Sequence, residues 1–238
     1  MRKICFATGN FYTWHKDRNR LIDYVKKLDV DGVELTMGHK EELYSFKLSR
    51  ANAEWLKKRH VSIHAPFRLV RNSEDEKEVE KQLRIIERLY KRLDAKNVII
   101  HPDDLPRPAI LKKFDMKIST ENMPKKKGIT IDHLKDILKR YRNLGLCVDV
   151  AHAYFWGKEE TRRLVRTFDK KITEFHFSCT YKRKDHLSLK KATRDFAYSI
   201  QPVIEHPATL VIEENMKDMK MKQVHEEVDH IKKLLKVR

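Results

Sequence analysis

The sequence has few of the residues that build nucleotide-binding loops or disulfide frameworks. It contains six glycines and neither a G-x-G-x-x-G nor a Walker motif, which disfavours a nucleotide-cofactor fold. Its three cysteines are an odd number without C-x-x-C spacing, so they indicate neither a disulfide framework nor a thiolate zinc site. No run approaches roughly 18 uninterrupted apolar residues, and no basic head followed by a long apolar run opens the chain. We therefore expect a cytoplasmic protein with no membrane partner.

The charge balance is strongly positive. Lysine and arginine number 52 against 35 acidic residues, a formal charge of +17, and charged residues make up 37% of the chain. Abundant charges of both signs, with only three glutamines, resemble the surface of a thermophile protein. A thermophile surface accounts for many charges of both signs but not for an excess of positive charge. Such an excess attracts polyanions, so DNA is a candidate partner.

The hydrophobic pattern alternates between short β-rich runs and segments of helical period. The apolar runs cover residues 3–7, 32–36, 61–64, 97–101, 117–121, 146–149, 173–177 and 209–213. Helical stripes lie between them, for example at Val79, Leu83 and Ile86. Eight strand–helix units in 238 residues predict an α/β fold, a (β/α)₈ TIM barrel, with a doubly wound open sheet as the alternative. No linker divides the chain, so we expect a single domain over residues 1–238.

Polar side chains end most of these runs, and one lies inside the seventh. In a barrel the carboxyl ends of the strands share one face. Each residue alone is more simply a core histidine or a helix cap. Together, however, they would repel one another and resist burial unless a cation neutralised them. Imidazole and carboxylate ligands without thiolate favour Zn²⁺ or Mn²⁺, with Fe and Co as alternatives. The set comprises His64, His101, Glu121, Asp149, His176 and Glu213.

Residues 147–153, Cys-Val-Asp-Val-Ala-His-Ala, resemble the V-D-x-x-H-A signature of the endonuclease IV family, which belongs to the wider xylose isomerase-like TIM barrels. The His-Pro pair at 101–102 and the Glu-Asn pair at 121–122 support the resemblance, which runs over nearly the whole chain. It implies a cluster of up to three ions: one held by His64 and His101, a second bridged to it by Glu121, and a third. The second ion would also be held by Asp149, His176 and Glu213, and the third by His152 and His186.

Two positions depart from the family pattern. Where the family has D-x-H, this chain has Lys184-Asp185-His186, so the carboxylate stands one residue late. Either Asp185 replaces the missing ninth ligand, or it points to solvent and Lys184 projects toward the cluster. Lys184 in the ligand position is a charge reversal, so the pattern favours the second outcome. The other departure is Phe177-Ser178, where the endonucleases usually have Asn-Asp after the histidine.

The resemblance implies a metal-dependent phosphodiesterase that cleaves DNA at abasic sites through a metal-activated hydroxide, with Glu121 and Glu213 as catalytic residues. Phe67, Lys182, Arg183 and Lys184 would contact the nucleotide and its phosphates. The alternative is a sugar or sugar-phosphate isomerase or epimerase, which would use one ion and a small phosphorylated sugar. A non-enzymatic nucleic-acid binder is disfavoured by the nearly complete ligand set.

Overall fold

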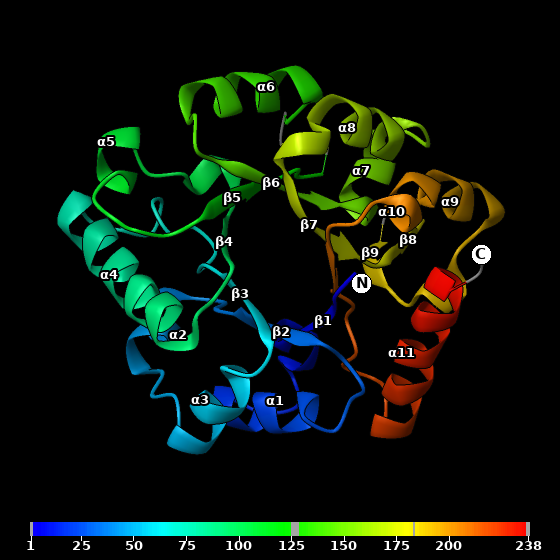
Figure 1. The fold of residues 1–238 in the computed structure, drawn as a ribbon, viewed down its shortest axis with the longest axis horizontal. Helices are drawn as coiled ribbons and strands as arrows, with labels where there is room; N and C mark the ends of the chain where they lie inside the picture. Colours follow the sequence, from blue (N-terminus) through cyan, green and yellow to red (C-terminus); the bar gives the residue numbers. More distant parts are fainter. Residues whose placement is uncertain (1, 125–128, 183, 237–238) are drawn as a thin grey trace.

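Eight parallel strands close into a barrel in the computed structural model, which describes residues 2–124, 129–182 and 184–236. Strand β1 pairs with both β2 and β10, so the sheet has no edge (Figure 1). The closed order confirms the predicted TIM barrel and rules out the open-sheet alternative. The barrel strands are β1 (Ile4–Ala7), β2 (Gly32–Thr36), β3 (His60–His64), β4 (Asn97–Ile100), β5 (Ile118–Glu121), β6 (Gly145–Asp149), β7 (Ile172–Phe177) and β10 (Thr209–Ile212).

Helices surround the barrel on all sides (Figure 1). In the longest, α4, the side chain of Asp75 accepts a hydrogen bond from the backbone of Glu78 at the first turn, and Val79, Leu83 and Ile86 face the core. The α-helices are α1 (Arg18–Val25), α2 (Lys40–Ser45), α3 (Arg50–Leu56), α4 (Glu76–Leu93), α5 (Pro108–Leu111), α6 (Ile131–Arg140), α7 (Val150–Trp156), α8 (Glu160–Phe168), α9 (Arg194–Ser199), α10 (Gln201–Glu205) and α11 (Met221–Lys236). Short 3₁₀ helices are η1 (Thr8–Phe11), η2 (Pro102–Asp104), η4 (Asp169–Lys171) and η5 (Leu189–Lys191).

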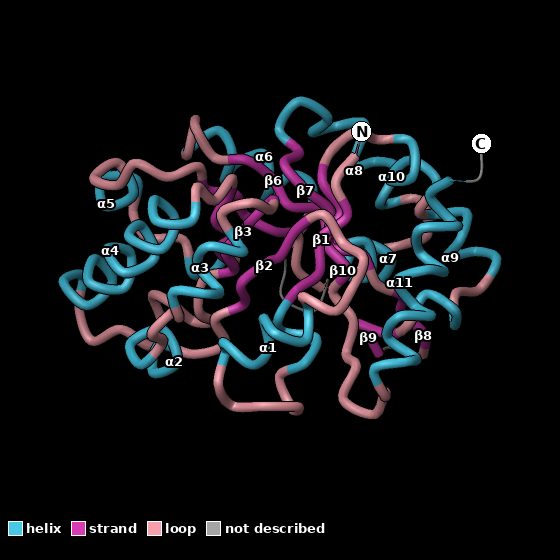
Figure 2. The backbone as a smooth tube through the Cα atoms, turned by 60° about the horizontal axis from the view of Figure 1, so that its bottom comes forward, coloured by secondary structure: helices cyan, strands magenta, loops and turns pink. Residues whose placement is uncertain are grey.

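A two-stranded antiparallel hairpin follows the seventh barrel strand, and the sequence pattern did not predict it. It consists of β8 (Cys179–Tyr181) and β9 (Lys184–Leu187). Figure 2 shows this hairpin on the side of the molecule opposite the N terminus. The amino end of β1 marks one end of the barrel, so the hairpin lies at the carboxyl ends of the strands. It therefore stands over the face where enzymes of this fold place their active sites.

The inside of the barrel is unusually polar. The main hydrophobic core lies between the strands and the helices, whereas Cys5, Ala7 and Val211 form only a small separate apolar cluster. Asn97 on β4 donates a hydrogen bond of 2.9 Å to Glu174 on β7, two strands that are not neighbours in the sheet, so this contact crosses the interior. Barrels of this type are usually filled with layers of branched apolar side chains. The buried polar residues here include Glu34, Ser62, Asn97, Ser119 and Glu174.

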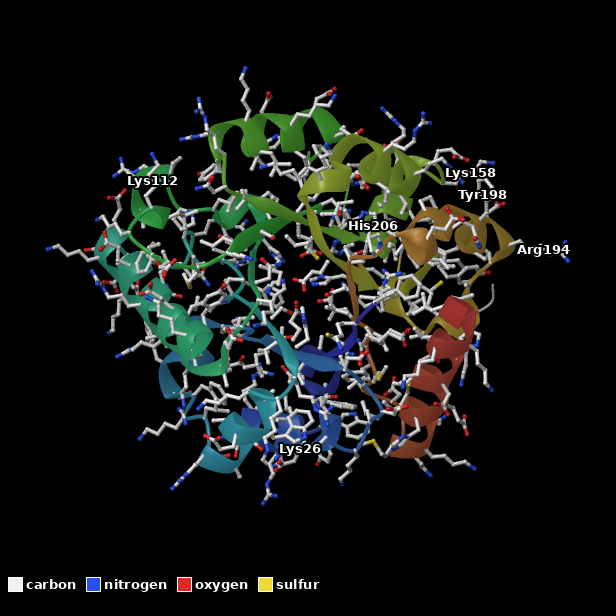
Figure 3. All side chains as sticks on the ribbon, in the orientation of Figure 1. Lys26, Lys112, Lys158, Arg194, Tyr198 and His206 are labelled. Carbon is white, nitrogen blue, oxygen red and sulfur yellow. The ribbon has the colours of Figure 1, made fainter. Side chains whose placement is uncertain are left out.

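Basic side chains lie on the solvent-facing surface of the outer helices. In Figure 3 the labelled Lys112, Lys158 and Arg194 point away from the barrel into solvent. Among the described residues, no helix combines the length and apolarity that crossing a membrane requires. The expected DNA partner is not tested by these features and stays a prediction.

Glu174 should make stability depend on pH. Burial, with the nearby charge of Glu34, raises the pKa of Glu174 from 4.5 to about 7. A raised pKa means that the stability contributed by this group is fully present below pH 4.5 and is lost as pH rises toward 7. Glu174→Gln cannot ionise, so its unfolding free energy relative to the parent should rise between pH 5 and pH 8, by about 1–3 kcal/mol. Denaturant unfolding of the metal-free proteins measures this. A difference between variant and parent that stays constant across this range would contradict the assignment.

Candidate metal centre

Glu121 lies at the centre of the carboxyl face of the barrel. It ends β5, is 1% exposed, and is surrounded by imidazoles from four other elements. Its carboxylate oxygens lie 3.7 Å from His64 Nε2, 3.6 Å from His101 Nε2, 3.3 Å from His152 Nδ1 and 3.4 Å from His176 Nδ1. Residues far apart in the chain thus meet around one carboxylate, as the strand-end pattern predicted.

Five groups of possible donor atoms occur among the described residues, with the donors of each group within 4.8 Å of one another, and three of them consist entirely of predicted ligands. We call Glu121, Asp149, His176 and Glu213 the central group. The first flanking group is His64, His101 and Glu121, and the second flanking group is Asp149, His152 and His186. Glu121 therefore belongs to the central and first groups, and Asp149 to the central and second. These buried clusters are consistent with divalent metal sites, and all eight predicted metal-ligating residues lie in them.

Asp149 serves the local fold and the site together. It ends β6 and caps helix α7, because its Oδ1 accepts a 2.6 Å hydrogen bond from the backbone of His152. The side chain of Asn122 clamps it, accepting from the Asp149 amide at 2.8 Å and donating to its carbonyl at 2.9 Å. One turn of α7 then places the imidazole of His152 over the same carboxylate, with Nδ1 3.6 Å from Oδ2. Capping leaves Oδ2 directed into the site.

Hydrogen bonds to backbone carbonyls hold three of the imidazoles in place. Nδ1 of His64, His152 and His186 lies within 2.9–3.1 Å of the backbone carbonyls of Ala65, Asn122 and Glu213, respectively. A backbone carbonyl only accepts, so each of these Nδ1 atoms carries a proton, and Nε2 is the nitrogen that can offer a lone pair to a metal ion once it is deprotonated. His176 is the exception, with its Nε2 next to a carboxylate. Such contacts orient histidines that ligate metals.

The clustered charges shift the acid–base behaviour of the group. Burial lowers the pKa of His64 and His152, but the facing carboxylates outweigh it and raise both to about 9. Burial likewise opposes ionisation of Glu121, yet the imidazoles around it hold its pKa well below the usual value. The same opposition lowers the pKa of Glu213 to about 2, whereas burial raises the pKa of Asp149. The carboxylates of Glu121 and Glu213 are thus stabilised by positive charge, which protonated imidazoles supply in the metal-free protein.

Three buried donor atoms support occupancy by a cation. Among the described residues, Asp149 Oδ2, His176 Nδ1 and Glu213 Oε2 are buried and make no hydrogen bond of acceptable geometry. All three belong to the central group, and His176 Nδ1 and Glu213 Oε2 approach to 2.9 Å. Buried polar atoms without partners are costly, and an ion between them would satisfy all three. Histidine nitrogens and carboxylate oxygens without thiolate suit Zn²⁺, with Mn²⁺ as the alternative, so the residues present fit the expected metal.

The hairpin brings Asp185 to the second flanking group. Cys179 pairs with Leu187 and Tyr181 with Lys184, so β9 carries one residue more than β8 between these pairs. His186 adopts a left-handed backbone conformation, with φ of 52°. A bulge of this kind changes the direction of neighbouring side chains. The Asp185 carboxylate lies 3.9 Å from His152 Nε2, and the His152 and His186 rings are 5.3 Å apart.

Asp185 thus approaches His152 while its side chain stays 37% exposed, so the choice between Asp185 and Lys184 at the cluster stays a prediction. The bulge compensates for the missing residue between aspartate and histidine, so that both side chains face His152. Lys184 is exposed, and its backbone carbonyl accepts a hydrogen bond from Thr180 Oγ1. Whether Asp185 binds metal stays a prediction.

The predicted substrate residues lie at the rim of the cluster. Phe67 is 39% exposed and stacks on His101, with ring centroids 5.2 Å apart. Lys182 is exposed in the hairpin turn, and its Nζ lies over the ring of Tyr181. Arg183 and the basic residues 125–127 lie outside the described residues. Substrate contact by Phe67, Lys182, Arg183 and Lys184 stays a prediction.

Sequence reasoning missed two buried acids beneath the site, Glu34 and Glu174. Both stand inside barrel strands and are at most 1% exposed. The signal was present, because a glutamate in the middle of an apolar strand such as Gly-Val-Glu-Leu-Thr needs a partner when buried. Glu34 and Glu174 stand inside their strands, so a pattern of polar residues at strand ends does not include them.

Comparisons with known proteins agree on the fold. A family model described as a xylose isomerase-like TIM barrel matches residues 22–234. No curated protein sequence matches the chain. Similar solved structures include a D-tagatose 3-epimerase-like protein, with 20% identity, a TM-score of 0.70, and coverage of 96% of this chain and 97% of the other.

Two further structures resemble the chain to a similar degree. The probable 3-DHS dehydratase AsbF from Bacillus anthracis has 14% identity and a TM-score of 0.73, with 97% and 98% of the two chains covered. Endonuclease IV from Thermus thermophilus has 16% identity and a TM-score of 0.62, with 96% and 99% covered. The three solved structures are named for different reactions, so their similarity to this chain establishes the fold alone.

Asp185→Asn should remove one bound ion if Asp185 completes the second flanking group. A neutral carboxamide is a poorer zinc ligand than a carboxylate. Elemental analysis of protein equilibrated with excess Zn²⁺ and then desalted should give three ions per chain in the parent and two in the variant. Asp195→Asn, an exposed aspartate on α9, is the matched control and should keep all three. Equal metal content in parent and Asp185→Asn would show that Asp185 is not a ligand.

Proposed function

The chain belongs to the xylose isomerase-like TIM barrel family, and from this premise we propose that it is a divalent-metal-dependent phosphodiesterase that cleaves DNA at abasic sites. The observation that carries the proposal is the sharing of carboxylates between donor groups. Glu121 and Asp149 each belong to two of the three groups. Such sharing supports a cluster of ions a few ångströms apart, the arrangement used by many enzymes that hydrolyse phosphate esters.

The four histidines outside the central group favour the phosphodiesterase over a one-ion isomerase. His64, His101, His152 and His186 add imidazole donors on both sides of the central group. An isomerase that works with one ion needs only the central group. Additional charged and oriented donors on both flanks are better explained by chemistry on a phosphodiester, where negative charge develops on several oxygens.

Different residues of this chain would hold the ions, orient the attacking water and contact the DNA. Glu121 and Asp149 would hold ions in common, and the hydrogen-bonded imidazoles would fix their positions. Divalent ions in such a site supply Lewis acidity and lower the pKa of bound water. Glu213 is ionised at neutral pH, because neighbouring imidazoles lower its pKa to about 2, and it would orient the attacking water. Phe67 would pack against the nucleotide, and Lys182, Arg183 and Lys184 would contact backbone phosphates.

A sugar or sugar-phosphate isomerase or epimerase is the second candidate. The central group favours it, because this group alone offers four donors from four strands or strand ends, whereas each flanking group offers three. With one ion in that group, Glu121 and Glu213 would stand on either side of a small sugar and exchange a proton with its carbon. The ligand would then be a phosphorylated sugar held by the basic hairpin.

Glu121→Gln should abolish activity and leave the fold intact. The change removes a shared metal-ligating charge while keeping the side-chain volume. We expect the rate of cleavage of an abasic-site oligonucleotide by the Zn²⁺- or Mn²⁺-loaded protein to fall by about 10³-fold or more. Asp132→Asn, an exposed residue at the start of α6, should retain the parent rate and the parent circular dichroism spectrum.

The same preparations should be assayed with ketose sugars and their phosphates. Epimerisation without cleavage of the oligonucleotide would replace the first proposal by the second. Full nuclease activity in Glu121→Gln would show that Glu121 does not have the role of shared metal ligand assigned to it here.

DNA binding should depend steeply on salt, with a measurable share carried by the hairpin. Each phosphate contact releases counterions and contributes about 0.9 to the slope of log affinity against log salt concentration. Replacing both Lys182 and Lys184 by alanine should reduce that slope by about 1.8, whereas replacing Lys26 and Lys112 at the ends of outer helices should not. Fluorescence anisotropy with duplex DNA between about 50 and 300 mM salt provides the slopes. Equal slopes for the hairpin variant and the parent would remove the hairpin from the DNA interface.

A further inference from the structure

His176 and Glu34 form a buried contact across the barrel. Glu34 stands in the middle of β2, and His176 near the end of β7. Glu34 Oε2 lies 3.1 Å from His176 Nε2, and neither side chain has any exposed surface. The two residues are 142 positions apart and meet only because the barrel is closed. The contact lies on the side of the imidazole opposite to the cluster, because Nδ1 is the atom near Glu121 and Glu213.

This contact differs in kind from those of the other anchored histidines. His64, His152 and His186 are held through Nδ1 by backbone carbonyls of loops or strand ends. His176 lies within β7, paired with Val211 on one side and Asp149 on the other, where backbone carbonyls serve the sheet. Among the four, His176 is the one whose Nε2 contacts a buried carboxylate outside the donor groups, while its Nδ1 lies near Glu121 and Glu213 of the central group.

The folding energetics of Glu34 do not explain its presence. A buried carboxylate with few hydrogen bonds usually costs stability compared with an apolar side chain of the same size. The second oxygen, Oε1, is buried and makes no hydrogen bond in the part of the chain that the structure describes. A residue that breaks a rule of core packing beside a functional cluster is expected to serve the function.

We propose that Glu34 is a positioning residue that sets the tautomer and orientation of His176. A carboxylate acceptor keeps the proton of His176 on Nε2, so that the Nδ1 lone pair faces the central group. Its negative charge also makes the imidazole a stronger donor to a cation. This inference rests on the proposed metal-binding function and adds a residue that none of the three donor groups contains.

Two substitutions separate the hydrogen bond from the charge. Glu34→Met removes both the acceptor and the charge while nearly preserving volume, and Glu34→Gln keeps an acceptor oxygen without the charge. Glu227→Gln is the matched control, because Glu227 is another buried glutamate, its oxygens accept hydrogen bonds from Ser188 and Leu189, and it belongs to none of the donor groups.

The measurements are Co²⁺ titration, followed by the visible absorption of the bound ion, and thermal unfolding of the metal-free proteins. We expect Glu34→Met to weaken the affinity of the central group by about 10- to 100-fold and to alter the Co²⁺ spectrum. Glu34→Gln should restore part of the affinity, and Glu227→Gln should bind as the parent does. Glu34→Met also leaves Nε2 of His176 buried without its acceptor, so the metal-free variant should unfold at a lower temperature than the parent. The altered Co²⁺ spectrum is the readout that a purely structural role would not move.

The outcomes that overturn the inference are distinct from failure of the proposed function. Parent-like Co²⁺ affinity and spectrum in Glu34→Met would show that His176 needs no positioning by Glu34. An equal loss of affinity in Glu227→Gln, with a Co²⁺ spectrum unchanged in both variants, would assign Glu34 to the fold alone. A parent protein that binds no Co²⁺ would instead remove the metal-dependent function itself, and the inference with it.

Discussion

The burial of Glu121 among four imidazoles is the interaction on which the rest of the site depends. A carboxylate with 1% exposure cannot remain ionised in a protein interior without compensating positive charge. In the metal-free protein this charge comes from protonated histidines, and the pKa of both His64 and His152 is raised to about 9. A divalent ion can replace those protons, because metal ligation requires neutral imidazole. Binding of metal should therefore release protons from the histidines, because either one supplies the positive charge that the buried carboxylate requires.

The interior of the barrel is polar where it supports this charged site, at some cost to apolar packing. Its interior contains Glu34, Ser62, Asn97, Ser119 and Glu174 in place of the branched apolar layers common in this fold. The main hydrophobic core lies outside the strands, beneath the helices, and is large enough to hold the fold. This separation lets the interior support the cluster, as the hydrogen bond that Glu34 accepts from His176 illustrates. Stability and function therefore occupy different layers of the same domain.

Sequence reasoning located the strands and the cluster for a physical reason. Short apolar runs ending in histidine or carboxylate carry both the period of a buried strand and the position of the active face. Asp149 was recognisable as a strand-end carboxylate, whereas His152 was implied by the resemblance of residues 147–153 to the family signature; the two meet at the first turn of α7. Glu34 was missed because its partner is defined only by closure of the barrel. The orientation of Asp185 depended on a one-residue bulge in β9, for which no periodic signal exists in the sequence.

Anomalous X-ray diffraction at the zinc absorption edge, from crystals of the Zn²⁺-loaded protein, tests the central claim most directly. We expect strong anomalous peaks at the carboxyl end of the barrel, one of them about 2.0–2.2 Å from a carboxylate oxygen of Glu121 and from Nδ1 of His176. Further peaks should lie between His64 and His101 and between His152 and His186. Zinc bound only at surface side chains, with no peak within ligand distance of Glu121, would contradict it.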